Sequence, residues 1–239
     1  MAQVTRAKPC ALIVSHGQPS DPTHAETALR RLAYLVGQRL PDWTIGSATM
    51  AAKGALHRAR ELHPDAPIYP LFMADGWFTG TALPERLIES DLQHLLPPLG
   101  MDGRLPALAV DILTQVLAAR DWQMSETCLI IAAHGGKTSK NPAKAAVHFA
   151  NAVRDLSGFL DVRLGFIEEQ PELSSIAVDA GKRAICLPFF AANGRHVRGD
   201  IPAALRAGGF QGVALDAIGH AAQIPDLIAQ SLRQAIGQP

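Results

Sequence analysis

The chain carries one sequence pattern twice, and the two copies are separated by a constant offset of 118 residues. The segment ALIVSHG at 11–17 returns as LIIAAHG at 129–135. Further along, PLFMADGWFTGTALP at 70–84 aligns without a gap on PFFAANGRHVRGDIP at 188–202. A repeat of this kind indicates that one structural unit was duplicated. The chain is therefore constrained to fold as two similar halves.

The two copies differ at a position that carries chemistry. His16 corresponds to His134, so both copies keep a histidine directly after the first apolar segment. In the second pair of segments, Phe78 stands where the other copy has His196. A phenyl ring binds no metal ion and accepts no proton. The repeat therefore predicts that the functional site lies in the C-terminal half.

Short apolar segments bounded by turn residues alternate with longer amphipathic ones. The short segments predict strands at 10–15, 44–49, 68–73, 128–133, 162–167 and 184–190. Their nearly continuous apolar character is typical of parallel strands that are buried on both faces. Apolar residues on one side predict helices at 23–40, 106–119, 141–156 and 224–236.

This alternation predicts an α/β fold with two parallel-sheet sandwich lobes. We expect the lobes to be residues 1–120 and 121–239, with the boundary near Ala119–Met124. Asp21-Pro22 and Asn141-Pro142 predict helix starts in which Asp21 and Asn141 supply the capping side chains.

The composition restricts the compartment and the partners. The 22 basic and 22 acidic residues balance, so no basic field marks a binder of nucleic acid or of a membrane surface. Cys10, Cys128 and Cys186 form no CxxC pair, and we expect them to be buried thiols of the core. No segment approaches the roughly 20 apolar residues of a spanning helix. We expect a cytoplasmic protein that is a monomer or a homodimer.

Three candidate functional residues, His134, Glu168 and His196, lie just past the ends of three predicted strands. The carboxyl ends of parallel strands meet at one edge of a sheet, where ligands bind in open α/β folds. Two imidazoles and one carboxylate can hold a divalent ion with positions left open, and an imidazole also accepts protons near neutral pH. We expect the three to be catalytic and metal-binding residues. Glu169 is the alternative to Glu168 as the acid.

Other residues near this edge allow two interpretations each. Asp200 either caps the following helix or hydrogen-bonds to a metal-binding imidazole. Lys137, Arg195 and Arg198 are either solvated charges or bind the carboxylates of an anionic substrate. In the N-terminal half the predicted strand end at 48–50 carries no acid, so the role of His16 stays open.

The remaining histidines fall on predicted helices or loops without a matching cluster, and we expect them on the solvated surface. They are His24, His57, His63, His94, His148 and His220.

Three segments of the C-terminal half resemble the class II tetrapyrrole chelatases, specifically the sirohydrochlorin chelatase (CbiX-like) family. AHGGKTSKNP at 133–142 takes the place of the family's HGSRDP-like segment. GFIEEQPEL at 165–173 is similar to its FLE-x-x-P stretch. LPFFAANGRHVRGDIPAAL at 187–205 is similar to its LPFFL-x-x-G-x-H-V-x-x-DIP signature. The resemblance extends over the whole chain in duplicated form.

The resemblance implies two parallel-sheet lobes with a tetrapyrrole bound in a cleft between them. It also implies insertion of cobalt or ferrous iron into sirohydrochlorin without nucleotide, for cobalamin or sirohaem synthesis. The family's metal-binding histidines fall on His134 and His196, and its acid on Glu168. The chain departs from the family in its lysine-rich KTSKNP and in lacking a His-rich segment and a C-terminal Cys motif.

Three other functions compete with metal insertion. A non-catalytic carrier of tetrapyrrole or metal is compatible with the same residues. A histidine phosphatase needs arginine directly before its histidine, whereas Ser15 and Ala133 stand there. A serine hydrolase is disfavoured because GxSxG is absent. The chain also has no phosphate-cradling P-loop, in keeping with a reaction without nucleotide.

Overall fold

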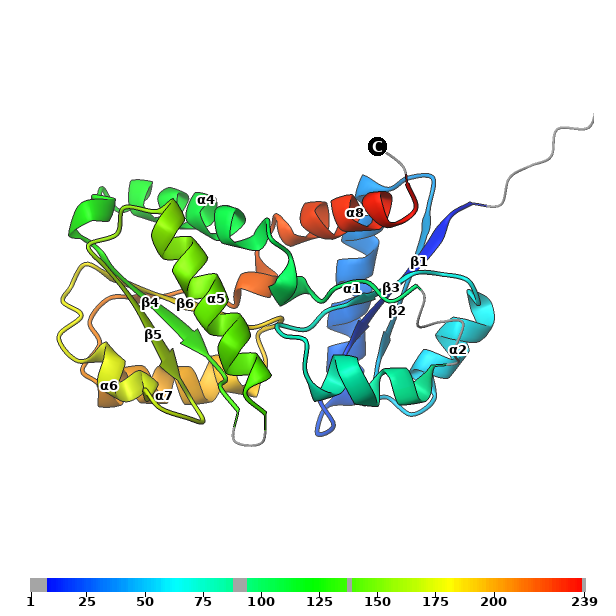
Figure 1. The fold of residues 1–239 in the computed structure, drawn as a ribbon, viewed down its shortest axis with the longest axis horizontal. Helices are drawn as coiled ribbons and strands as arrows, with labels where there is room; N and C mark the ends of the chain where they lie inside the picture. The colour runs from blue at the N-terminus through cyan, green and yellow to red at the C-terminus, as the bar shows by residue number, and fades with distance from the viewer. Residues whose placement is uncertain (1–7, 88–93, 137–138, 238–239) are drawn as a thin grey trace, which may run out of the picture. The chain divides into compact units, whose positions relative to one another are not determined.

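A computed structural model describes residues 8–87, 94–136 and 139–237, and in them strands alternate with helices (Figure 1). The strands are β1 (Cys10–Ser15), β2 (Thr44–Thr49), β3 (Ile68–Pro70), β4 (Cys128–Ala133), β5 (Asp161–Phe166), β6 (Ala184–Pro188) and β7 (Val213–Ala214). The α-helices are α1 (Pro22–Arg39), α2 (Ala55–Leu62), α4 (Leu105–Ala118), α5 (Asn141–Leu156), α6 (Leu173–Ala177), α7 (Ile201–Ala207) and α8 (Ile224–Ala235).

The predicted alternation of strands and helices is confirmed, with differences at the ends of elements. The strands β3 and β6 end at Pro70 and Pro188, short of the predicted ends. The residue after each proline makes one more hydrogen bond to the central strand, from the Leu71 N–H to the Val14 carbonyl oxygen and from the Phe189 N–H to that of Ala132. The prediction that Asn141 caps its helix was wrong. Helix α5 begins at Asn141 itself, and the Ser139 hydroxyl accepts a hydrogen bond from its N–H at 3.3 Å.

The strands form two all-parallel sheets, ordered β2-β1-β3 and β5-β4-β6-β7. Their pairing repeats with the sequence: Leu12 pairs with Ile68, and Ile130 pairs with Cys186. Both partners are displaced by the same 118 residues. The duplication therefore holds in the register of this strand pair. In the other pair the register differs by one residue, because Ser15 pairs with Thr49 whereas Ala133 pairs with Phe166. The predicted fold class of two parallel α/β sandwiches is confirmed.

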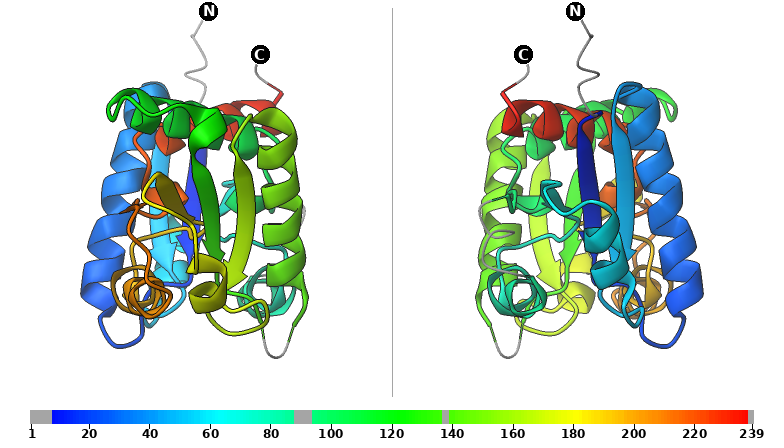
Figure 2. Two further views of the ribbon diagram at one scale, coloured as in Figure 1. Left: turned by 90° about the vertical axis from the view of Figure 1, so that its left-hand side faces the viewer. Right: turned by 90° about the vertical axis from the view of Figure 1, so that its right-hand side faces the viewer.

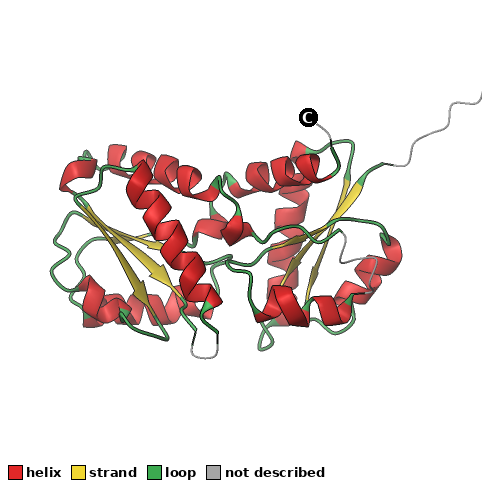
Figure 3. Cartoon of the chain, in the orientation of Figure 1, coloured by secondary structure: helices red, strands yellow, loops and turns green. Residues whose placement is uncertain are grey.

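Each sheet lies between layers of helices (Figure 3). In the C-terminal sheet, α5 connects β4 to its neighbour β5 on one side. Helix α6 then connects β5 to β6, which pairs with β4 on the other side. Right-handed crossovers in opposite directions place the two helices on opposite faces. Figure 2 shows α5 on one side of β4 and β5, and α6 and α7 on the other. The core beneath α6 and α7 joins Ile130 and Cys186 to Leu173 and Leu205.

The compact units do not follow the predicted division at residue 120. One unit comprises residues 1–71, 78–97 and 224–239, and the other comprises 72–77 and 98–223. Helix α4, which the repeat assigns to the first half, packs on α5, while α8 from the chain's end packs on α1. Each copy has thus exchanged its last helix. The two exchanged helices occupy equivalent places in the repeat, because α4 displaced by 118 residues falls on α8 and α1 displaced by 118 residues falls on α5.

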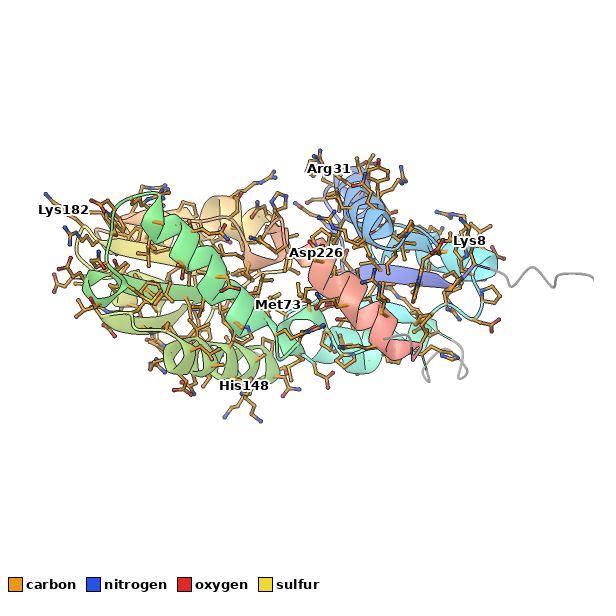
Figure 4. All side chains as sticks on the ribbon, turned by 90° about the horizontal axis from the view of Figure 1, so that it is seen from above. Lys8, Arg31, Met73, His148, Lys182 and Asp226 are labelled. Carbon is orange, nitrogen blue, oxygen red and sulfur yellow. The ribbon has the colours of Figure 1, made fainter. Side chains whose placement is uncertain are left out.

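Within the first unit, α8 is held on α1 by apolar and polar contacts. Leu227, Ile228 and Leu232 are buried. At the helix surface, the Arg39 guanidinium donates to both carboxylate oxygens of Asp226 at 3.1 and 3.3 Å. Asp226 is labelled on α8 in Figure 4. This ion pair is partly exposed, so burial of the apolar side chains contributes most of the stability. None of the described helices is long and apolar enough to cross a membrane.

Candidate active site

Three predicted site residues, His134, Glu168 and His196, lie at the carboxyl edge of the C-terminal sheet. His134 directly follows β4, Glu168 follows β5, and His196 follows the loop after β6. The first two loops are joined through the backbone, because the Glu168 N–H donates to the His134 carbonyl oxygen at 3.1 Å. Parallel pairing therefore brings together residues that span 62 positions, as predicted.

His196 is positioned by a short π-helix, His196–Asp200, which continues into α7. Val197 and Ile201 are buried in the core over the sheet, whereas His196 and Asp200 are partly exposed. The members of each pair are four residues apart and lie on the same side of the helical segment. The side with Val197 and Ile201 packs into the core, and the side with His196 and Asp200 faces the site. π-Helical turns are rare and often occur at functional sites.

The imidazoles of His134 and His196 are in contact. Their ring centroids lie 4.7 Å apart, and the rings are nearly perpendicular, at 86°. The Phe190 ring lies beside both, with centroid distances of 6.4 Å to His134 and 6.2 Å to His196. The prediction did not include Phe190, although it ends the LPFF stretch of the family signature. This ring supplies an apolar wall to the histidine pair.

Each imidazole is held through its Nδ1 atom. The Nδ1 atom of His134 lies 3.1 Å from the Gly135 carbonyl oxygen, and that of His196 lies 2.7 Å from the Asp200 carboxylate. These oxygens can only accept, so both Nδ1 atoms carry the proton. In the neutral rings the lone pair then lies on Nε2. The site thus presents two Nε2 atoms that can take a metal ion or a proton.

Of the two interpretations of Asp200, the structure supports the hydrogen bond to an imidazole rather than the helix cap. Its carboxylate contacts His196, and its side chain makes no capping hydrogen bond to α7. A carboxylate on the far nitrogen of an imidazole orients the ring and makes it a better ligand. A functional role for Asp200 stays a prediction.

Glu168 approaches His134 without bonding to it. Its Oε1 atom lies 3.9 Å from the His134 Nε2 atom, beyond hydrogen-bonding distance. Across the described part of the chain, no three His, Cys, Asp or Glu side chains are arranged so that they could hold a metal ion. The predicted set of His134, His196 and Glu168 is not assembled as a ligand cluster in this structure. Metal binding by these residues stays a prediction.

A pocket of about 470 Å³ opens beside Glu168. Four carboxylates contribute to its lining, together with apolar side chains of β5, α6 and α7. The acidic lining residues are Glu168, Glu169, Glu172 and Asp200. Because Glu168 and Asp200 also contact the two histidines, the pocket and the histidine pair form one continuous polar region.

The predicted substrate-binding cations flank His196. Arg195 directly precedes it, and Arg198 lies two residues after it, and both are exposed. Among the described residues, neither arginine side chain has a hydrogen bond or ion pair. Both are thus available to an anionic ligand. Lys137 lies outside the described residues.

The N-terminal copy keeps the scaffold of this site. His16 Nδ1 lies 2.9 Å from the Gly17 carbonyl oxygen, and Gly17 has φ +77°, against +75° for Gly135. A second π-helix, Phe78–Ala82, occupies the position equivalent to His196–Asp200. Phe78 and Ala82 thus replace the histidine and the acid on a retained backbone.

One feature of this copy was not predicted. The strand end at 48–50 does receive an acid, because Glu26 on α1 accepts a hydrogen bond from the Thr49 N–H. The repeat alignment missed this carboxylate because it comes from a helix rather than from the loop equivalent to 167–169.

The other histidines are mostly at the surface, as expected. His24, His57, His94, His148 and His220 are exposed, and His148 lies on the outer face of α5 (Figure 4). His63 is half-buried at the end of α2.

Comparison with known proteins places the chain in a family. The family model for CbiX matches residues 128–235, which include all of the candidate site. A solved structure of CbiX, described as the terminal enzyme of siroheme biosynthesis in denitrifying bacteria, is 41% identical to the chain. The two superpose with a TM-score of 0.86, over 95% of this chain and 99% of the other. The chain belongs to the CbiX family.

More distant relatives agree. A probable sirohydrochlorin cobaltochelatase of Halobacterium salinarum is 23% identical over 162 residues, which cover 56% of this chain and 55% of the archaeal protein. The match thus spans about half of that relative's length. SirB from Bacillus subtilis, whose structure contains Fe³⁺, shares 12% identity and a TM-score of 0.74 over 96% of each chain. At that identity the likeness supports the chelatase fold alone.

Proposed function

We propose that this CbiX-family protein inserts a divalent metal ion, cobalt or ferrous iron, into sirohydrochlorin without using a nucleotide. The observation that carries the proposal is the contact between His134 and His196, with both Nδ1 atoms held and both Nε2 atoms presented at one sheet edge. The relatives described above support the class of substrate.

The chemistry of insertion requires groups that act in turn as ligand and base. A tetrapyrrole that takes up a divalent ion loses two pyrrole protons, while the ion exchanges its ligands one by one for ring nitrogens. A neutral imidazole can do either task through its Nε2 atom. The carboxylates of Glu168 and Asp200 each lie within 4 Å of one imidazole ring, so an acid group stands beside each of the two histidines.

The charges around the site fit a macrocycle that carries many carboxylates. Arg195 and Arg198 flank His196, and their guanidinium groups can each hold a carboxylate through paired hydrogen bonds. We assign to them, and to Lys137, the binding of the substrate's acid groups. The pocket beside Glu168 is lined by carboxylates, so its negative charge suits the approach of the metal cation rather than that of the anionic macrocycle.

The experiment follows the absorption spectrum of sirohydrochlorin mixed with the protein and either Co²⁺ or Fe²⁺, with ATP absent. We expect the spectrum of the metallated product to appear much faster than in a mixture without protein. Running both metals in parallel gives the preference between them.

The alternative function, a carrier of tetrapyrrole or metal, predicts another result. A carrier would bind sirohydrochlorin tightly and shift its spectrum, yet leave the rate of metallation at that of the uncatalysed mixture. That result would overturn the proposed insertion activity.

A further inference from the structure

Two adjacent carboxylates, Glu168 and Glu169, point to different partners. Glu168 faces the His134 imidazole, with Oε1 at 3.9 Å from Nε2. Glu169 instead accepts a hydrogen bond from the Gly136 N–H, with Oε2 at 3.1 Å from the nitrogen. The loop after β5 thus offers one acid to the site and the other to the backbone of the loop after β4.

The loop after β4 leaves little room for change at this contact. Gly135 is buried and has φ +75°, a conformation that side chains rarely adopt. A Cβ atom placed there would lie 2.7 Å from the Glu169 Cγ atom and 3.2 Å from the Phe166 Cβ atom. The Glu169 side chain therefore packs directly over the turn whose carbonyl oxygen holds the His134 ring.

We propose that Glu169 is a positioning residue that clamps the loop after β4 to the loop after β5 and thereby holds His134 against Glu168. This inference rests on the proposed function for its effect on metal insertion. The clamp has two parts: the Glu168 N–H bonded to the His134 carbonyl oxygen, and the Glu169 carboxylate bonded to the Gly136 N–H. Only the second depends on a side chain.

The N-terminal copy shows what the turn does without such a clamp. His16 and Gly17 keep the same local geometry, so the turn itself forms from the His-Gly sequence. There, however, the packing partners of Gly17 are Thr49 and Ala51, and Gln18 takes the place of Gly136. Among the residues that the structure describes, the carboxylate clamp therefore occurs in the copy that keeps the second histidine. The clamp fixes the position of the loop after β4 relative to the loop after β5, and neither loop needs it to fold.

The test compares Glu169→Ala, Glu169→Gln and Glu168→Gln in the full chain. Glutamine keeps an oxygen that can accept from Gly136, whereas alanine does not. We expect Glu169→Ala to raise the hydrogen-exchange rate of the Gly136 amide by about tenfold or more. It should also change the ¹⁵N signals of the His134 ring and lower kcat for insertion by about 10- to 100-fold, with KM within about twofold. Glu169→Gln should restore most of all three properties.

Two variants serve as controls. Glu168→Gln should lower kcat while leaving the Gly136 amide protected. Asp155→Ala removes an exposed carboxylate of α5, far along the helix from the site, and should change nothing. Thermal unfolding of each variant separates a loss of fold from a loss of positioning.

The proposal is overturned if the Gly136 amide and the His134 ring are unchanged in Glu169→Ala, or if Glu169→Gln is as inactive as Glu169→Ala. The latter result would mean that the charge itself takes part in the reaction. If the wild-type protein inserts no metal, the proposed function fails, while the amide and ring signals still decide whether the clamp exists.

Discussion

The reactivity of the site depends on which nitrogen of each imidazole is free. The Gly135 carbonyl and the Asp200 carboxylate occupy the two Nδ1 atoms, so both rings turn Nε2 toward ligands. A sequence pattern can supply the histidines but not the tautomer, because the tautomer is set by hydrogen bonds that form only in the fold. At this scale the sequence predicted His134, His196 and Glu168 as neighbours, while the Phe190 wall and the Glu169 clamp required the structure.

Substitution of Asp200 tests whether the orientation of the His196 ring matters for metal binding. Replacing it by alanine removes the acceptor from His196 Nδ1 and frees the ring to rotate. We expect Asp200→Ala to weaken metal binding or slow insertion by about 10- to 100-fold. Asp200→Asn keeps an acceptor oxygen and should lose less. Titration of Co²⁺ into each variant, followed by its absorption bands, gives the affinities, and equal losses in the two variants would contradict an orienting role.

The elements show where local sequence determines structure and where it does not. The bounds of β1, β2 and β4 were predicted correctly because each is a short apolar segment between turn residues. The π-helices were not predicted, since their side-chain pattern is that of an ordinary helix start. The exchange of α4 and α8 was not predicted either. An apolar helix face predicts that a helix packs on a neighbour, but it does not say which of the helices α1 and α5 that neighbour is.

The strand cysteines give a prediction that depends on burial. Cys128 and Cys186 are buried as expected, whereas Cys10 is only half-buried and the expectation of a core thiol was wrong for it. Burial raises the pKa of Cys186 to about 12 and also raises the pKa of Cys128. We expect iodoacetamide at about pH 8 to label Cys10 in the folded protein and to spare the other two. Peptide mass spectrometry reads the result, and rapid labelling of Cys186 would contradict the packing of β6.

The raised pKa of Cys186 also predicts how the free energy of unfolding varies with pH. An unfolded thiol loses its proton near about pH 8.5, whereas the folded Cys186 keeps it to about pH 12. The folded state therefore binds more protons in this window, and the free energy of unfolding should fall as the pH rises through it. Cys186→Ala should reduce this decline, which urea unfolding at several pH values measures.

The packing of α8 on α1 predicts which unit loses stability when α8 is altered. Leu232 is completely buried in the first unit. Leu232→Ala should lower the free energy of unfolding of that unit by about 2–5 kcal/mol, from lost burial and a residual cavity. Hydrogen exchange should accelerate in α1 and β1 and stay slow in β4 and β6. If β4 lost protection and α1 did not, α8 would belong to the other unit.

At the scale of the whole molecule, the repeat acts as an internal comparison. The β1–β3 and β4–β6 pairings, the His-Gly turn and the π-helix recur 118 residues apart, while the second histidine and Asp200 have no counterpart at the aligned positions of the other copy. Sequence alone was sufficient to predict this asymmetry, because aligned positions can be compared directly. It was not sufficient for contributions that cross between elements, such as Glu26 reaching the end of β2.

We propose that metal insertion depends on the C-terminal copy of the repeat. A matched pair of histidine variants, one in each copy, distinguishes the two copies. His196→Ala and His16→Ala each remove one partly exposed imidazole at a strand edge, so both should leave the fold intact, which circular dichroism and thermal unfolding can verify. Metallation of sirohydrochlorin by each variant is then followed by absorption, with Co²⁺ or Fe²⁺. We expect His196→Ala to abolish insertion and His16→Ala to retain most of the wild-type rate. An equal loss in both variants would contradict a single site in the C-terminal copy.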